Sequence, residues 1–445
     1  MENQEKRSIS LNFGVRGWIV IIYCFISFLV GGAFLGVWQI MVTANVSALG
    51  WNSTVIFSLT NVAGVIMCLI EMYISRLMMR NKINLARLGT IMFAIFVAAC
   101  IIMRFSSSMV VIFNLMFIVC YITTNGQSMC VNGSLVGNWW PKRRGMVIGI
   151  TTIGVPLGSA FGNGLYYAFA ALVGESNVLF VYAIIGAVVV AIGAFLVRDF
   201  PEQVGCYPDN DKSESREQLE AEFEAMRKAQ PKNAWNIKRI LTTKQAWLII
   251  LIGFVSFNSN GIYMMQSMNR LTVFGPLEMS QAMVLMTIAS VVALFGSPVC
   301  GIVDQKLGTK RCGIFILILC LACTVLQLPG QYMTILVGMI IFGIVMGGAS
   351  NIVVSLASDA WPRESSSRAF SIIQPVMHII TMGINQCYLL LASRVGTYMP
   401  VYFVYIVLII IAFIFFGGFY DPKKVHALDA KYKEQDAQAD TAAQA

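Results

Sequence analysis

The feature that most constrains this chain is a series of apolar stretches, each about 20 residues long and separated by polar loops. A helix of about 20 residues can cross the roughly 30 Å hydrocarbon core of a bilayer. No short alternating pattern of the barrel type is visible, so we expect each stretch to be a helix that satisfies its own backbone hydrogen bonds. The expected spans are residues 18–42, 53–75, 88–104, 109–136, 145–171, 178–197, 245–268, 281–303, 312–328, 332–357, 369–392 and 400–419. The sequence therefore predicts an all-α integral membrane protein with twelve transmembrane helices.

A motif in the loop before the fifth span returns half a chain later. The sequence WPKRR at 140–144 reappears in part as WPR at 361–363. Each copy precedes an apolar helix that contains one proline, Pro156 or Pro375. The repetition predicts two pseudo-symmetric six-helix halves, which is how many secondary transporters are built. The expected units are an N-terminal tail at 1–17, a first half at 18–198, a central loop at 199–244, a second half at 245–420 and a C-terminal tail at 421–445.

The basic residues are distributed unevenly over the loops. Nearly all lie on the side of the two tails, and only Arg104, Arg270 and Arg394 are expected on the other side. The positive-inside rule therefore places both termini in the cytoplasm. With 57% hydrophobic residues, the net charge of +9 indicates loops that face anionic lipid rather than a nucleic-acid partner.

The polar segments carry few signals of chemistry. The central loop mixes acids and bases, and a helix could form at 214–228, whereas the tail at 421–445 is expected to be disordered. No G-x4-G-K-[ST] loop is present, and most of the 11 cysteines fall within apolar helices. We therefore expect no cofactor, no metal site and no enzymatic activity.

Two loops resemble those of a known family. Gly301-x-x-Asp304 followed by Gly308-x-Lys310-Arg311 resembles a loop of the major facilitator superfamily, and Asn138 to Gly145 is similar to the Trp-Phe-Pro-x-Lys-Arg-Gly signature of its oxalate:formate antiporter and monocarboxylate porter branch. The resemblance implies a central cavity open alternately to each side, organic anions as cargo and a bacterial cytoplasmic membrane. The basic residues of that branch's dicarboxylate clamp are absent, since Ser297 precedes the proline of span 8.

Polar residues near the middle of the spans are candidates for a substrate site, because such groups are costly when they face lipid. His378 is the titratable candidate, for substrate binding and for proton coupling. The other candidates are Trp38, Gln39, Thr124, Asn125, Gln127, Asn258, Asn260, Asn351 and Gln374. For each of these the alternative is a hydrogen bond that joins two helices.

Three charged residues near span ends have two interpretations each. Arg270 could attract an anion into the outer mouth, or it could extend to the membrane surface like other interfacial bases. Glu71 and Asp359 are expected to pair with nearby arginines rather than to carry protons.

A second set of residues is expected to control movement between the halves. Gly154 and Gly158 are four residues apart, a spacing that lets helices approach closely. Pro156 and Pro375 provide places to bend. The pair of charges at Asp304 and Arg311 could rearrange when the halves rock.

These patterns together predict a secondary transporter that moves a small organic anion, a monocarboxylate with an apolar body, coupled to protons or a counter-substrate. One alternative is transport of a neutral or weakly polar molecule, motivated by the missing basic clamp. Another is a membrane sensor that keeps the same fold without transporting. The expected partners are the substrate and the lipid bilayer, and we expect a monomer.

Overall fold

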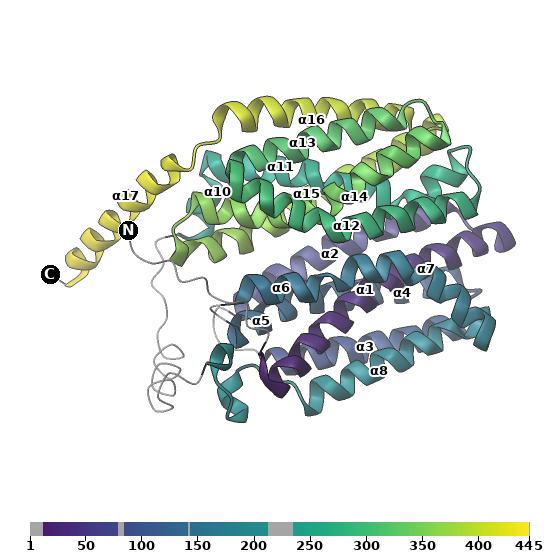
Figure 1. Cartoon of the computed structure of the whole chain (residues 1–445), viewed down its shortest axis with the longest axis horizontal. Helices are drawn as coiled ribbons and strands as arrows, with labels where there is room; N and C mark the ends of the chain where they lie inside the picture. Colours follow the sequence, from purple (N-terminus) through teal and green to yellow (C-terminus); the bar gives the residue numbers. More distant parts are fainter. Residues whose placement is uncertain (1–11, 79–83, 141–142, 212–234, 445) are drawn as a thin grey trace.

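The computed structural model describes residues 12–78, 84–140, 143–211 and 235–444 (Figure 1). Within these ranges the regular elements are helices, and no strand occurs. The N-terminal helices are α1 (Gly14–Leu49), α2 (Ser53–Met78), α3 (Leu85–Phe105), α4 (Val110–Gly126), α5 (Gly133–Trp139), α6 (Arg144–Thr152), α7 (Gly154–Val173) and α8 (Val178–Phe195). The C-terminal helices are α10 (Ile237–Leu241), α11 (Lys244–Asn260), α12 (Met279–Leu307), α13 (Thr309–Gln327), α14 (Tyr332–Ala360), α15 (Arg363–Val395), α16 (Met399–Phe419) and α17 (Lys423–Gln444). The possible helix at 214–228 lies outside the described residues.

The predicted number of membrane spans is confirmed. Eleven described helices are long and apolar enough to cross a bilayer, and a bent pair at Met146–Gly162 and Gly164–Val173 makes the twelfth span. The helix is interrupted at Ile153, one turn before Pro156, because proline lacks an N–H and its ring crowds the carbonyl four residues earlier. The largest bend, 59°, lies further along, between Gly162 and Gly164, so Pro156 is not where this span bends most.

The spans form two bundles that lie side by side, α1 to α8 in one and α11 to α16 in the other (Figure 1). We call them the N-half and the C-half. Helix α1 begins and α16 ends at the same end of the molecule, which we call the terminal end, and we call the opposite end the distal end (Figure 1). Each bundle buries an apolar core, and Leu389 of α15 is buried in the core of the N-half.

Glycines allow very close contact between some helices. A Cβ atom on Gly158 of α7 would lie 2.2 Å from the carbonyl oxygen of Leu29 in α1, and one on Gly154 would lie 2.5 Å from that of Phe25. In the C-half, a Cβ on Gly347 of α14 would lie 2.3 Å from a carbonyl oxygen of α12. The close approach that the glycine spacing predicts is therefore present, while the gating role of these residues remains a prediction.

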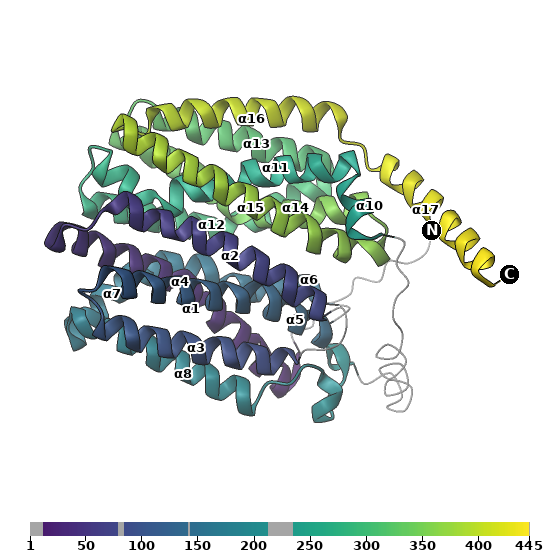
Figure 2. The ribbon, with the colours of Figure 1, turned by 180° about the vertical axis from the view of Figure 1, so that it is seen from behind.

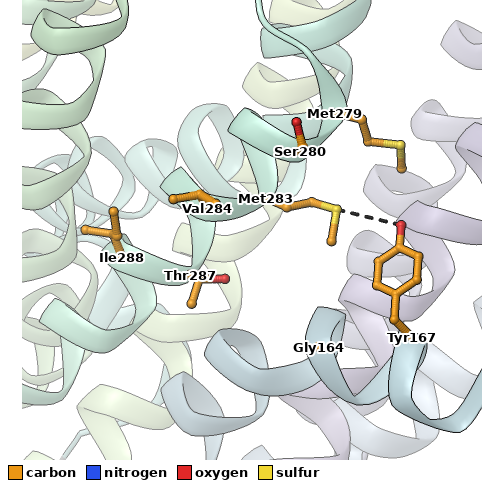
Figure 3. Close-up of a pocket in the computed structure, with 8 residues that line it drawn as sticks. All are labelled: Gly164, Tyr167, Met279, Ser280, Met283, Val284, Thr287 and Ile288. Atoms are coloured by element: carbon orange, nitrogen blue, oxygen red, sulfur yellow. Dashed lines mark hydrogen bonds between the residues drawn. The ribbon is translucent and has the colours of Figure 1, made fainter.

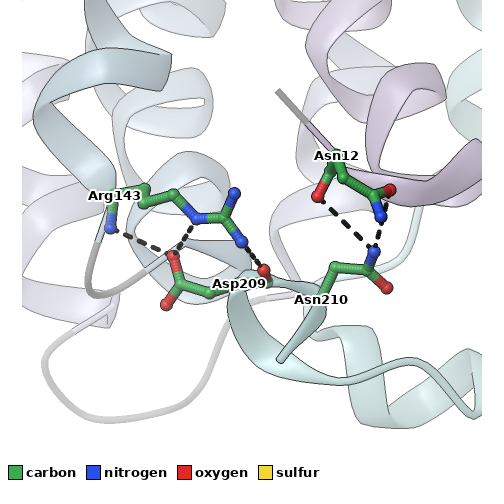
Figure 4. A network of polar contacts seen from close by, with 4 residues as sticks. All are labelled: Asn12, Arg143, Asp209 and Asn210. Atoms are coloured by element: carbon green, nitrogen blue, oxygen red, sulfur yellow. Dashed lines mark hydrogen bonds and ion pairs between the residues drawn. The ribbon is translucent and has the colours of Figure 1, made fainter. Parts of the chain in front are cut away.

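A polar cluster holds the start of the central loop against the N-half (Figure 4). The Arg143 backbone N–H donates to the Asp209 carboxylate at 3.0 Å, and its guanidinium forms a salt bridge with the same carboxylate at 3.5 Å. The Asn210 side chain donates to Asn12 at 3.3 Å. Phe13 packs edge-on against Trp140, whose motif opened the first repeat. The residues before the first span and after the sixth thus meet at the terminal end of the N-half.

The second copy of the Trp-Pro motif, at Trp361, also packs against residues outside the spans. These residues lie just before the seventh span and after the last one. Trp361 meets Trp235 edge-on at 5.7 Å, and the indole N–H of Trp235 donates to Asp429 of α17 at 2.7 Å. Arg239 and Asp436 form two hydrogen bonds of 2.8 Å. The prediction of a disordered tail is therefore wrong, because contacts with residues almost 200 positions earlier stabilise α17.

The docking of α17 should depend on pH. The two hydrogen bonds from Arg239 lower the pKa of the Asp436 carboxyl. A group with a lowered pKa in the folded state stabilises that state above its unfolded pKa, about 3.9, and this contribution is lost as the pH falls through the folded value. We expect a spin label at the exposed Gln435 to become more mobile as the pH falls below about 4. Asp436→Asn should show that mobility already at pH 7, whereas Glu434→Gln, which removes an exposed carboxylate, should leave it unchanged.

Candidate functional site

The candidate site lies where the two halves face each other. Hydrogen bonds between the halves occur in the distal portions of the helices. Gln39 of α1 donates to the Met265 carbonyl at 3.3 Å. Asn61 of α2 donates to the Gln386 side chain of α15 at 2.8 Å, and Gln386 in turn donates to Ser58 at 2.8 Å. These contacts join the halves at the distal end.

A groove of about 540 Å³ opens between α7 and α12, in the distal parts of both helices (Figure 3). Tyr167 points toward Met283, with 3.8 Å between its hydroxyl and the sulfur (Figure 3). The lining is mostly apolar and comprises Gly164, Tyr167, Met279, Ser280, Met283, Val284, Thr287 and Ile288. It contains none of the polar residues that the sequence predicts for the substrate site.

Helices in both halves depart from α geometry in the membrane. Helix α4 continues into a π-helix at Gln127–Asn132, and α11 continues into π-helices at Gly261–Met265 and Asn269–Val273. Such segments often occur at functional sites, and interrupted helices at a repeat interface often mark the substrate site of a transporter. These interruptions follow the polar residues Asn125 and Asn258 to Asn260.

The C-half places several predicted residues together. His378 of α15 meets Phe257 of α11 at 5.0 Å between ring centres, and the structure shows no hydrogen bond to its imidazole from any described residue. Gln374 lies one turn earlier on α15. The neighbouring Asn258 is fully buried with neither amide atom paired, and the Asn260 amide oxygen is also unpaired.

The N-half contributes two further unpaired groups from α1. Trp38 is fully buried and stacks on Phe117 with 3.9 Å between ring centres, but its indole N–H has no partner among the described atoms. The Gln39 side-chain oxygen is unpaired as well, although its nitrogen bridges to the C-half. Unpaired buried polar atoms are uncommon in proteins and often mark a place where a ligand or water binds.

Arg270 lies elsewhere in this structure, inside the C-half. Only 2% of its surface is exposed, so the expectation that it extends to the membrane surface is wrong, while its attraction of an anion into an open outer mouth remains a prediction. Its guanidinium donates to Gln327 and to the Tyr402 hydroxyl at 3.0 Å each, and it lies over the Tyr263 ring at 5.1 Å. All these partners belong to the C-half, so Arg270 is part of that core.

Comparison with known proteins gives the family. Residues 24–384 and 279–442 match the model of the Major Facilitator Superfamily. The chain belongs to this superfamily. Two solved structures of superfamily fold resemble it: a D-xylose-proton symporter, with a TM-score of 0.66 and 12% identity over 92% of this chain and 99% of that one, and a POT family transporter in complex with a thioalcohol-conjugated peptide, with a TM-score of 0.66 and 15% identity over 89% and 95%. A comparison with curated sequences finds no match. At these identities the structures show the fold alone, and it is the superfamily match that supports a secondary transporter.

Other predicted site residues of this major facilitator are bonded within the N-half. The Thr124 hydroxyl and the Asn125 amide donate to carbonyls of the preceding turn of α4. Gln127 donates to the Tyr23 hydroxyl at 3.0 Å and to Asn132 at 3.1 Å. The bond from Gln127 to Tyr23 of α1 fits the alternative that the residue joins two helices, whereas the bonds of Thr124 and Asn125 stay within α4. The role of all three as lining remains a prediction. The side chain of Asn351 lies outside the described part of the structure.

The predicted gating charges are separate in this structure. Asp304 is partly exposed and Arg311 is exposed, and no salt bridge joins them in the part of the chain described. Asp359 is expected from the sequence to pair with nearby arginines. In the structure it accepts a hydrogen bond from the Tyr420 hydroxyl at 3.1 Å. Pro375 is buried inside α15, which continues through it.

Sequence reasoning missed the polar contact between α2 and α15. Asn61 and Gln386 are buried or partly buried polar residues within spans, so the argument used for Asn258 would also have selected them. Each stands beside another polar residue, Thr60 or Asn385, but their partnership across the two halves could not be read from spacing within one helix.

Proposed function

We propose that this protein is a secondary transporter that carries a small organic molecule by exposing the interface between its halves alternately to the two sides of the membrane. The cargo has an apolar body, and neutral hydrogen-bonding groups hold its polar end. The observation that supports this cargo is the set of unpaired polar atoms on Trp38, Gln39, Asn258 and Asn260. Of the described lysines and arginines only Arg270 is buried, and it lies in the C-half core.

The state of the structure supports alternating access. The hydrogen bonds found between described residues of the two halves join the distal portions of the helices. With both termini in the cytoplasm, as the basic loops indicate, the distal end is the external one. The structure then corresponds to a transporter closed to the outside of a cytoplasmic membrane, and the opposite state requires these bonds to break.

A monocarboxylate is the second candidate cargo. The loop from Asn138 to Gly145, with its likeness to the monocarboxylate porter branch, favours it. Neutral donors such as the indole N–H of Trp38 and the Asn258 amide can donate hydrogen bonds to a carboxylate, and His378 could hold a proton that travels with it.

Uptake into proteoliposomes tests the function and separates the two cargo classes. We expect saturable, counterflow-stimulated uptake of neutral or weakly polar compounds with apolar bodies, tested beside labelled mono- and dicarboxylates. Asn258→Leu should lower that uptake about tenfold, which is roughly the loss of one buried hydrogen bond. Thr123→Val is the matched control, because its hydroxyl bonds only to carbonyls of its own helix. Uptake restricted to monocarboxylates would favour the second candidate, and absence of saturable uptake of any compound would contradict transport of this cargo class.

A further inference from the structure

Glu71 of α2 is a carboxyl group inside a membrane span, and no described residue pairs with it. Its residue is only 8% exposed, and it makes no hydrogen bond or ion pair with any described residue. The arginine expected to pair with it, Arg76, has a side chain outside the described part. An ionised carboxylate in such surroundings is costly, so an acidic residue in a span generally marks a functional site.

Glu71 belongs to a helix that runs along the boundary between the halves. Figure 2 shows α2 of the N-half beside α15 of the C-half. Their register is fixed at the distal end by the hydrogen bond between Asn61 and Gln386. One turn further, a Cβ on Gly64 would lie 2.7 Å from the Met382 sulfur. The two helices are therefore antiparallel, and higher residue numbers on α2 face lower residue numbers on α15.

This register brings Glu71 and His378 to similar depth. At 1.5 Å per residue, Glu71 lies about 15 Å beyond Asn61 along α2, and His378 lies about 12 Å beyond Gln386 along α15. From the contact of Gly64 with Met382, one turn along α15 leads to His378. One turn along α2 leads to Cys68, and Glu71 follows three residues later on the same face. The two titratable groups therefore follow the same pair of helices from the distal contact toward the terminal end.

Among the described residues of the helices that pack around the two groups, no buried charge provides another partner. The thiols of Cys68, on the same helix, and Cys130, from the π-helix of α4, are close enough to Glu71 to interact electrostatically. His378 faces the Phe257 ring of α11. In the described parts of α1, α4, α11 and α14 that pack around these two groups, no lysine, arginine or aspartate is buried.

We propose that Glu71 and His378 form a single proton-binding site across the interface, assembled when the terminal end closes. The inference rests on the proposed alternation between the two ends. While the groups are apart, each is neutral, with the proton on the Glu71 carboxyl. On closure the O–H bond of Glu71 breaks and an N–H bond forms on His378, giving a carboxylate–imidazolium pair that holds the same proton.

The pairing makes closure sensitive to pH. The assembled pair stabilises the bound proton, so it keeps this proton to a higher pH than Glu71 does alone. In the pH range where the open state has lost its proton and the closed state has not, adding protons favours closure. Lowering the pH from 9 to 6 therefore increases the closed population.

Distance measurements without any cargo test this inference. Spin labels replace the exposed Arg87 of α3 and Lys306 of α12, at the terminal ends of the two halves, after Cys206 and Cys387 are changed to serine. In nanodiscs, we expect the short-distance population to rise at least threefold from pH 9 to pH 6. Glu71→Gln and His378→Gln should each abolish the rise, and the double variant should add nothing further.

Two controls keep the test specific. Glu202→Gln removes a half-buried carboxyl outside the interface and should retain the pH response. Glu71→Asp keeps the carboxyl group and should also respond, which guards against a Gln variant that fails to fold. A full response in either Gln variant, or none in the unmodified protein, would overturn the pair. Cargo uptake with no pH response would overturn the pair alone, whereas a pH response without uptake would leave the pair in place and contradict the cargo proposal.

Discussion

Replacing Gly158 with valine should strongly disrupt the packing of the N-half. The added Cβ would lie 2.2 Å from the Leu29 carbonyl oxygen and 2.8 Å from the Ala33 nitrogen. Both are backbone atoms, so no side-chain movement can relieve the overlap, and α1 and α7 must separate. We expect a loss of at least about 3 kcal/mol in the free energy of unfolding, the upper end of usual overpacking costs. Thermal unfolding of the purified protein in detergent measures it.

Gly149→Val is the matched control for this substitution. It lies in α6 of the same span, and a Cβ there would meet no atom within 4 Å. It therefore reports the helix propensity of valine in place of glycine without a clash. If the two variants unfolded at the same temperature, the close contact of α1 and α7 would not exist in the protein.

Arg270→Ala should destabilise the C-half by a similar amount. The substitution removes two hydrogen bonds from a charged donor and leaves Gln327 and the Tyr402 hydroxyl buried without it. We expect a loss of about 3–5 kcal/mol, visible as a lower unfolding temperature. Arg270→Lys keeps the charge but not the planar fork, so it should recover only part of this loss.

Arg394→Ala provides the comparison, because Arg394 is exposed near the distal end of α15. It should change stability by no more than about 0.5 kcal/mol. An Arg270→Ala protein of normal stability that selectively lost uptake of anions would contradict a purely structural Arg270 and restore its interpretation as an anion-attracting residue.

The membrane spans could be predicted from sequence because hydrophobic length is a local property. The predicted span at 332–357, for example, corresponds to α14 at Tyr332–Ala360. The place of Arg270 could not be predicted in this way. A base near the end of a span ordinarily reaches the membrane surface, and only the fold shows that Tyr402, from a helix more than 100 residues later, covers it.

The polar residues of the candidate site could be predicted from the sequence, but their hydrogen-bond partners could not. The rule that polar groups avoid lipid selected Gln39, Asn258 and His378, and equally selected Gln127, which bonds to Tyr23 within the N-half. Whether such a residue faces another half or a neighbouring helix depends on its direction around the helix axis. That direction follows from tertiary packing, which composition and spacing do not report.

The contacts around the two Trp-Pro loops can form at different stages of protein synthesis. The cluster of Arg143 and Asp209 under the N-half uses residues that all precede the seventh span, so it can form while the ribosome is still making the second half. The cluster around Trp361 requires Asp429, which follows the last span in the sequence. The second bundle therefore receives this contact only after all its spans have been made, and a premature stop codon shortly before position 429 would yield a chain with all its spans but an unfinished C-half.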